Sequence, residues 1–163
     1  MVKRKIETPK YIIYLSDIFF DAEVELFLVG GYVRNSLLDL PVTDLDIASN
    51  AKPEQVIRIL KNKDEIKIIQ KAMDFGTIQI DLFFENKKYS FEHTTFRKDF
   101  YHDDGTHRPS HVEFTDEINL DASRRDFTIN SIYYSISKDR IIDPLGGAED
   151  LKKQLIRADK KDA

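Results

Sequence analysis

Asp44-Leu45-Asp46-Ile47 places two acidic residues two positions apart between apolar ones. On a strand, side chains i and i+2 point to the same face, so Leu45 and Ile47 would face the core and both carboxylates would face outward. Neighbouring carboxylates repel each other, and a divalent cation removes that repulsion. Mg²⁺ prefers oxygen ligands and takes one or two carboxylates together with substrate phosphates. The pair therefore predicts a Mg²⁺ site, and the alternative is a solvated edge strand with two loose acids.

A glycine pair, Gly30-Gly31, separates a short apolar run from apolar residues at helical spacing. We expect a strand over residues 25–29 and a helix over residues 32–38. Glycine lets a backbone approach a ligand closely, and a helix N-terminus presents unpaired N–H groups to an anion. Arg34, one turn into the helix, would reach the same anion as a charged donor. The turn indicates a phosphate site, with an ordinary strand-to-helix turn as the alternative.

A third acid would complete such a site, and Glu92 is the main candidate. It lies on an expected strand over residues 89–95, after a turn at residues 85–88. Asp81 and Glu85 are alternative candidates for the third acid. Glu92 could also be an ordinary surface acid of the strand without a role in the site. A phosphate-binding turn followed by metal-binding carboxylates is what nucleotidyl transfer needs. Two metal ions about 3.5–4 Å apart then bridge the attacking oxygen, the α-phosphate and the leaving pyrophosphate.

Two consecutive arginines and an aspartate, Arg124-Arg125-Asp126, stand at the start of a helix that we expect over residues 126–134. Guanidinium groups bind phosphate through charge-assisted hydrogen bonds, so this group is suited to a triphosphate and a ribose. The alternatives are structural: Asp126 caps the helix, or Arg124 pairs with Asp126 or with Asp121.

Three of the four histidines, His102, His107 and His111, lie close together beside two aspartates, and His93 lies further upstream. A metal cluster is conceivable from this composition. Because the chain offers no Cys and no His pair at helical spacing, we interpret residues 97–109 as a polar loop.

The elements that would position these residues alternate between helices and strands. Further helices are expected over residues 11–20, 53–60 and 148–155, and further strands over residues 44–48, 66–69, 77–84 and 112–114, with a small hairpin over residues 136–142. Because one hairpin is antiparallel and the elements are mixed, we predict an α+β fold whose mixed sheet is flanked by helices, covering it on one side.

Composition limits the class of protein. The 163 residues correspond to one domain, and 41% hydrophobic with 33% charged residues is typical of a soluble globular protein. The absence of Cys excludes disulfides and thiolate metal sites. No apolar run approaches the roughly 20 residues of a membrane span, so we expect a cytoplasmic protein without membrane contact. The net charge of −4 argues against a chain whose main role is to grip nucleic-acid backbone.

Taken together, these segments resemble one family: class II tRNA nucleotidyltransferases (CCA-adding enzymes) and bacterial poly(A) polymerases. The order and spacing fit over about residues 27–158. The segments that carry the resemblance are Leu28-Val29-Gly30-Gly31 with Arg34, Asp44-Leu45-Asp46-Ile47-Ala48, Phe75-Gly76-Thr77, Glu92 with Thr94-Thr95-Phe96-Arg97, Arg108-Pro109, Val112-Glu113-Phe114, Arg124-Arg125-Asp126-Phe127-Thr128-Ile129-Asn130-Ser131, Ile142-Asp143-Pro144-Leu145-Gly146-Gly147 and Leu155-Ile156-Arg157-Ala158.

The resemblance implies a polymerase-β-like nucleotidyltransferase head domain. Asp44 and Asp46 would hold two Mg²⁺ ions, and Glu92 would be the third catalytic carboxylate. An RNA 3′-hydroxyl, in this family that of the tRNA acceptor end, would attack the α-phosphate of ATP or CTP and release pyrophosphate. The nucleotide would be bound by Gly30, Gly31, Arg34, Arg125, Asp126 and Asn130.

The chain also departs from the family pattern. In that family a helical neck, which carries the motif that selects ATP or CTP, follows the head, and helical body and tail domains hold the tRNA. None of these segments occurs within residues 1–163, so we expect a single head domain that is a fragment of a longer protein or a stand-alone head. The alternatives are a poly(A) polymerase, a non-catalytic nucleotide-binding module with the same fold, and a transferase acting on protein or a small molecule.

Overall fold

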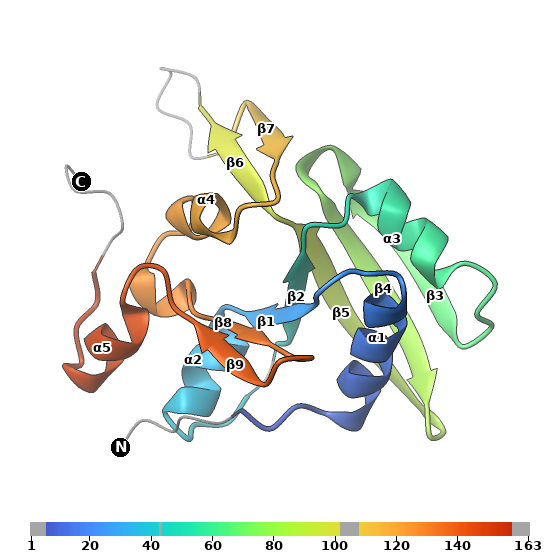
Figure 1. Ribbon diagram of the computed structural model, residues 1–163, viewed down its shortest axis with the longest axis horizontal. Coiled ribbons are helices and arrows are strands. Elements are labelled where there is room, and N and C mark those ends of the chain that lie inside the picture. Colours follow the sequence, from blue (N-terminus) through green and yellow to red (C-terminus); the bar gives the residue numbers. More distant parts are fainter. Residues whose placement is uncertain (1–5, 43, 102–107, 158–163) are drawn as a thin grey trace.

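The chain forms a mixed β-sheet with helices packed against it (Figure 1), in a computed structural model that describes residues 6–42, 44–101 and 108–157. Its strands are β1 (Phe27–Val29), β2 (Asp46–Ser49), β3 (Ile66–Ala72), β4 (Thr77–Phe84), β5 (Lys87–Thr95), β6 (Arg97–Phe100), β7 (His111–Phe114), β8 (Tyr133–Ser135) and β9 (Arg140–Ile142). Its helices are α1 (Lys10–Asp21), α2 (Gly31–Leu37), α3 (Pro53–Leu60), α4 (Ile118–Ser123) and α5 (Gly147–Lys152), with short 3₁₀ helices η1 (Met73–Phe75) and η2 (Thr128–Asn130).

Seven strands make up the main sheet in the order β3-β4-β5-β2-β1-β8-β9, and β6 and β7 form a separate two-stranded ribbon. β2 runs parallel to β5, whereas β2 and β8 both pair antiparallel with β1. The sheet is therefore mixed, and the predicted α+β class is confirmed. The register places Asp46 beside Glu92 on one side and beside Val29 on the other.

The first three helices share one hydrophobic core with one face of the sheet. In α1 the fully buried residues Ile12, Leu15 and Phe19 recur at helical spacing, which turns one stripe of the helix toward the strands. Leu28 of β1 and Ile47 of β2 face the same core and have no exposed surface. Full burial of such side chains stabilises the fold by about 1.5–3 kcal/mol each, so this core holds the central strands in place.

A second, smaller core lies on the opposite face of the sheet. It joins Phe27 and Val29 of β1 to Phe96, to Ala122 of α4 and to Tyr133 of β8. The three aromatic rings meet with centroids 5.7 to 6.3 Å apart. The sheet was predicted to have helices on one side only, whereas α4 covers part of the opposite face.

The helix predicted over residues 126–134 is wrong. The structure has only the 3₁₀ helix η2 there, and then strand β8. Tyr133 and Tyr134 pair in register with Val29 and Leu28 of β1, and both tyrosines are buried. Pairing with the central strand, available only in the assembled sheet, outweighs the local helical pattern.

Three neighbouring expectations also change. The polar loop predicted over residues 97–109 begins with β6, which pairs with β7. The C-terminal hairpin starts earlier than predicted, because its first strand is β8. α4 corresponds to no predicted element. His102 and His107 lie outside the described residues.

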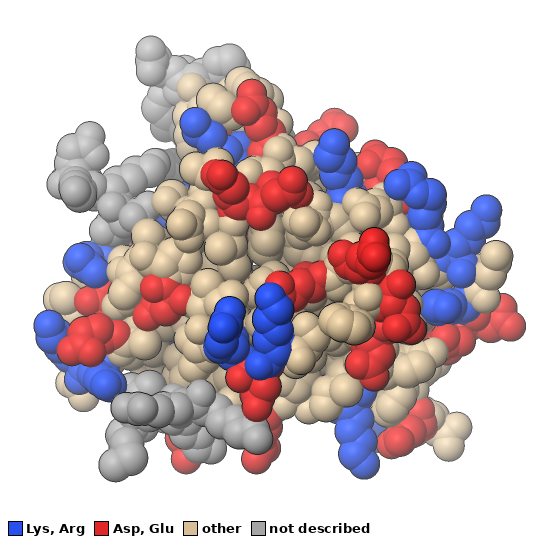
Figure 2. Space-filling view, viewed as in Figure 1, with Lys and Arg blue, Asp and Glu red and all other residues tan. Residues whose placement is uncertain are grey.

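Acidic and basic side chains are intermixed on the face that carries α1 and the β8–β9 hairpin, as Figure 2 shows. That face offers no broad field of a single charge, consistent with the small net charge of −4. Within the described ranges, none of the helices has the length and apolar character needed to cross a bilayer.

Candidate active site

The glycine pair forms the turn between β1 and α2. Gly30 adopts a left-handed backbone with φ of 79°, which side chains other than glycine rarely accept. A Cβ atom there would lie 3.9 Å from Oδ2 of Asp46. A Cβ atom on Gly31 would lie 3.2 Å from Nη2 of Arg34. The turn therefore runs close to one candidate carboxylate and beneath one candidate phosphate-binding arginine.

Arg34 ties α2 to the 3₁₀ helix that follows the arginine pair. Its Nη1 donates to Oδ1 of Asn130 at 2.7 Å, and its Nε donates to Oδ1 of Asn35 at 3.0 Å. Two predicted nucleotide-binding residues, which are 96 positions apart in the sequence, are thus in direct contact.

The three candidate carboxylates come from the neighbouring strands β2 and β5. Asp46 is the first residue of β2, and Glu92 lies beside it on β5. Asp44 precedes β2, so the strand starts two residues later than predicted. Burial nevertheless alternates as expected: Leu45 and Ile47 are buried, whereas Asp44 and Asp46 are exposed.

The electrostatic environment of Asp46 is that of a crowded carboxylate. Although its side chain reaches solvent, the protein around Asp46 displaces part of its hydration and raises its pKa above the ordinary value; the charges of Glu92 and Asp44 raise the pKa further, and Arg125 acts in the opposite direction. Nζ of Lys71 lies 3.9 Å from Oε2 of Glu92, an exposed pair that contributes little. A divalent cation relieves this kind of repulsion, so the donor set fits Mg²⁺.

The carboxylates do not by themselves form a complete metal cage. Within the part of the chain that the structure describes, no group of three or more His, Asp or Glu side chains is gathered closely enough to hold an ion. Mg²⁺ usually keeps several positions for water and substrate phosphates, so a two-carboxylate arrangement is compatible with it. The carboxylates open into a cavity of about 410 Å³, which is lined by Tyr11, Asp44, Leu45, Asp46, Gln79, Ser90, Phe91 and Glu92.

A second cavity, of about 330 Å³, brings the arginine pair together with two more predicted site residues. Its lining is Arg97, Asp99, Tyr101, Pro109, Arg124, Arg125, Asp126 and Asn130. Three of these side chains are cationic, which suits an anionic ligand. Arg125 belongs to this cavity and also acts on Asp46, so it links the basic cavity to the carboxylates.

The structure also shows where the alternatives weighed from the sequence lie. Asp81 is buried and accepts hydrogen bonds from Gln79 and Ser90, and it does not itself line the cavity of the three carboxylates. Glu85 lies in the hairpin turn between β4 and β5. Arg124 pairs with Asp121, one of the structural partners considered for it.

Asp126 does not cap a helix, because the residue at the start of η2 is Phe127 and no side chain caps that end. His93 is wholly buried, and burial lowers its pKa to about 3, so the ring is neutral. Its Nε2 lies 2.7 Å from Oγ of Ser49. His111 stacks on Phe100 in the β6–β7 ribbon, with ring centroids 4.6 Å apart.

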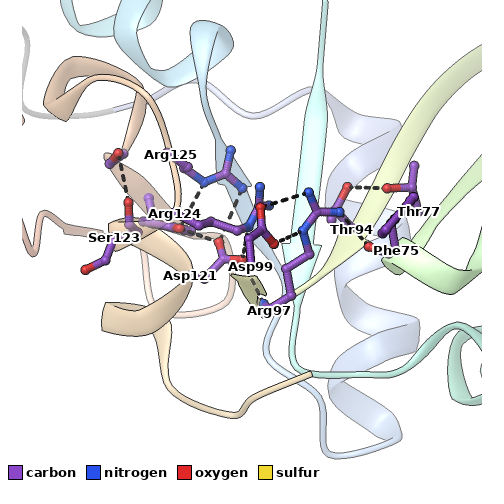
Figure 3. A network of polar contacts seen from close by, with 12 residues as sticks. Phe75, Thr77, Thr94, Arg97, Asp99, Asp121, Ser123, Arg124 and Arg125 are labelled. Carbon is purple, nitrogen blue, oxygen red and sulfur yellow. Dashed lines mark hydrogen bonds and ion pairs between the residues drawn. The ribbon is translucent and has the colours of Figure 1, made fainter. Parts of the chain in front are cut away.

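Three residues hold the arginine pair in place, and sequence reasoning considered only one of these contacts, that of Asp121 with Arg124. Asp121 accepts from both arginines, Tyr133 accepts from Nε of Arg125, and the backbone N–H of Arg97 donates to Asp121 (Figure 3). Asp121 was considered only as a partner for Arg124, and no local pattern marks the other two. The signal available in the sequence was the spacing, because Asp121 lies three positions before Arg124 and four before Arg125.

Comparison with known proteins decides the family. Residues 26–157 match the family model described as the poly A polymerase head domain. The chain belongs to this family. The CCA-adding enzyme of Ligilactobacillus salivarius is 38% identical over 138 residues, covering 85% of this chain and 31% of that protein. The CCA-adding enzyme of Anoxybacillus flavithermus is 39% identical over 132 residues, covering 81% of this chain and 30% of that protein.

Solved structures of CCA-adding enzymes agree with this assignment. The Bacillus stearothermophilus CCA-adding enzyme in complex with CTP matches with a TM-score of 0.74 and 29% identity, over 95% of this chain and 35% of that chain. A tRNA nucleotidyltransferase complexed with a primer tRNA and an incoming ATP analog matches with a TM-score of 0.65 and 27% identity, over 90% of this chain and 39% of that chain. The chain thus spans about a third of the length of the relatives it matches.

Proposed function

We propose that the chain is the catalytic head of a template-independent RNA nucleotidyltransferase, which works in the cytoplasm and adds AMP, CMP or both from ATP and CTP to the 3′ end of tRNA. The observation that carries the proposal is the placement of Asp46, which lies beside Glu92 and within range of the charge of Arg125, a residue of the basic cavity. The relatives named as CCA-adding enzymes favour addition to tRNA over the synthesis of poly(A) tails, which the family name suggests.

Asp44 and Asp46 are the residues that would hold Mg²⁺. The raised pKa of Asp46 supports this, because carboxylates that repel each other gain from a shared cation. When bound, Mg²⁺ supplies positive charge at the phosphates and lowers the pKa of the attacking hydroxyl. Glu92, beside Asp46 on the neighbouring strand, would be the third carboxylate, which orients that hydroxyl and takes up its proton.

The nucleotide would bind across the basic side of the site. Arg125, with 17% of its side chain exposed, provides a fixed positive charge for the triphosphate. Arg34 and Asn130, already hydrogen-bonded to each other, bring the Gly30-Gly31 turn and η2 to the same ligand. Asp126 lines the same cavity and is suited to a ribose hydroxyl.

In the reaction, the RNA 3′-hydroxyl oxygen forms a bond to the α-phosphorus of the nucleotide. The bond from that phosphorus to the bridging oxygen breaks, and pyrophosphate leaves. The side chains of the protein mainly position charge and orient the two reactants, as in other phosphoryl transfers.

The proposal is tested by incubating the chain with Mg²⁺, labelled ATP or CTP, and tRNA that lacks one, two or three 3′ nucleotides. We expect label to be transferred to tRNA. Incorporation of A alone would indicate an A-adding enzyme, and incorporation of both C and A would indicate a CCA-adding enzyme. A variant with Asp44→Ala and Asp46→Ala should transfer none, whereas a variant with Glu54→Ala and Asp64→Ala, two exposed acids outside the site, should match the parent.

Transfer to protein instead of tRNA would contradict the proposed substrate. Nucleotide binding without transfer, in a chain joined to the segments that follow the head in full-length relatives, would favour a non-catalytic module. Long homopolymers of A on RNA of any sequence would favour a poly(A) polymerase.

A further inference from the structure

Asp121 is a fully buried carboxylate whose oxygens are both saturated with hydrogen bonds. Oδ1 accepts from Nε of Arg124 at 3.0 Å and from the backbone N–H of Arg97 at 3.0 Å. Oδ2 accepts from Nη2 of Arg125 at 3.3 Å and from the hydroxyl of Tyr133. A carboxylate has about four acceptor positions, and here each one is filled by a donor from the surrounding elements.

Tyr133 closes a three-membered ring of contacts. Its hydroxyl donates to Asp121 and accepts from Nε of Arg125 at 3.1 Å. Tyr133 is itself 0% exposed and packs in the smaller core with Phe27 of β1 and with Phe96. A rigid, buried side chain therefore fixes the direction of the Arg125 guanidinium from below.

The charge of Asp121 compensates two adjacent cations. Burial alone would raise the pKa of Asp121, but Arg125 and Arg124 outweigh it and hold the pKa below its ordinary value. The arginine side chains are only 13% and 17% exposed. Removing one partner of a buried ion pair leaves charge that the protein no longer balances, so the guanidinium groups would separate or turn toward water.

The far side of Arg125 is directed to the site. Among contacts between described residues, Nη1 of Arg125 has no hydrogen-bond partner, whereas Nε and Nη2 are both engaged. Arg125 also lines the basic cavity together with Arg124. Asp121 and Tyr133 thus hold the edge of the guanidinium group that Nε and Nη2 form, and they leave Nη1 for a ligand in the cavity.

We infer that Asp121 is a positioning residue for nucleotide binding: with Tyr133 it locks Arg125 in the orientation that receives the triphosphate. The inference rests on the proposed function. Asp121 also anchors the start of β6 through the Arg97 N–H, and the Arg97 side chain continues to Asp99 and to the carbonyl of Phe75 (Figure 3).

The first test compares the affinity of the 163-residue chain for MgATP, measured by titration calorimetry, with that of Asp121→Asn and Tyr133→Phe. We expect at least about tenfold weaker binding in Asp121→Asn, a typical cost for removing a supporting partner, and a smaller loss in Tyr133→Phe. Tyr134→Phe is the matched control for Tyr133→Phe and should bind as the parent does, because the Tyr134 hydroxyl donates to Asp139 and not to the arginine pair.

The second test separates positioning from general loss of structure. Asp121→Asn is combined with Arg125→Ala in a double-mutant cycle for MgATP affinity. If Asp121 acts through Arg125, the double variant binds no more weakly than Arg125→Ala alone. Additive losses would overturn the inference, as would unchanged affinity in Asp121→Asn.

If Asp121→Asn fails to fold, Tyr133→Phe carries the same cycle, because it leaves both charges in place. The two proposals fail differently. Loss of binding in Arg125→Ala with full binding in Asp121→Asn and Tyr133→Phe rejects the positioning role and keeps the proposed function. A parent chain that does not bind MgATP rejects the proposed function and the positioning role together.

Discussion

Asp46 connects the two chemical halves of the site, since the carboxylates of Glu92 and Asp44 raise its pKa and the charge of Arg125 opposes that rise. Its raised pKa means that ionised Asp46 is less favourable in the folded chain than in the unfolded chain. The folded chain therefore loses stability as pH rises from the ordinary value of 3.8 through the raised pKa. At neutral pH the full cost is present.

Asp46→Asn should consequently stabilise the metal-free chain at pH 7, because the amide keeps the shape of the side chain and removes the repelled charge. The stability gain over the parent should shrink as pH falls toward 3.8. Urea unfolding of both chains at pH 7 and pH 4, in the presence of a chelator, measures this difference in the free energy of unfolding. An equal gain at both pH values would show that charge crowding is not its cause.

Asp81→Asn should have the opposite effect, which makes it an informative companion. Hydrogen bonds from Gln79 and Ser90, with Lys88 nearby, overcome burial and lower the pKa of Asp81. Its ionised form stabilises the fold above the ordinary pKa, and that stability is lost as pH falls through the lowered pKa. We expect Asp81→Asn to lower the free energy of unfolding by about 1–2 kcal/mol at pH 7 in the same assay. A stabilised Asp81→Asn would contradict this account.

At the scale of single residues, local spacing predicts what local geometry controls. Alternation of apolar and acidic residues correctly places Asp44 and Asp46 on one outward face, and the glycine pair correctly marks the turn. Asp121 and Tyr133 could not be recognised in the same way. Their significance comes from contacts with Arg97 and the arginine pair, and those form only when α4, β6 and β8 pack together.

At the scale of elements, the contact between α5 and η2 is the tightest glycine packing in the described chain. A Cβ atom on Gly147 would lie 2.1 Å from the carbonyl oxygen of Thr128 and 2.9 Å from Cγ1 of Ile132. Because the nearest atom belongs to the backbone, an added methyl group forces the two elements apart. η2 carries Asn130, so the displacement would reach the site.

Gly147→Ala is therefore expected to lower the free energy of unfolding by about 1–3 kcal/mol, the usual cost of overpacking. Urea unfolding monitored by circular dichroism measures the loss. Glu149→Ala in the same helix is the control, since this side chain points into no comparable contact, and we expect a change within about 0.5 kcal/mol. Unchanged stability in Gly147→Ala would mean that α5 can shift freely.

The elements that sequence reasoning misjudged are those whose state depends on the sheet. Residues 126–134 carry a helical pattern, yet Tyr133 and Tyr134 complete the sheet beside β1. Residues 97–100 are polar enough for a loop, yet they pair with β7. In contrast α3, which begins at a proline, and β4, which lies in the sheet between β3 and β5, form over the predicted residues.

At the scale of the whole molecule, strand order is what assembles the site. Placing β2 between β5 and β1 sets Asp46 beside Glu92 and beside the end of β1, where the glycine turn begins. Adding β8 on the other side of β1 brings η2 and the arginine pair to the same face. The residues predicted for metal and nucleotide binding are thus brought together within a chain that spans about a third of the length of its relatives.

The most direct test of the central claim is the Mg²⁺ dependence of ATP binding, measured by calorimetry on the parent chain and on the variant with Asp44→Ala and Asp46→Ala. We expect the parent chain to bind ATP more tightly with Mg²⁺ than with a chelator. The Asp44→Ala, Asp46→Ala variant should lose this difference in affinity while staying folded. The charge-matched variant with Glu54→Ala and Asp64→Ala should retain it. Equal Mg²⁺-dependent affinity in the parent and in the Asp44→Ala, Asp46→Ala variant would contradict the account.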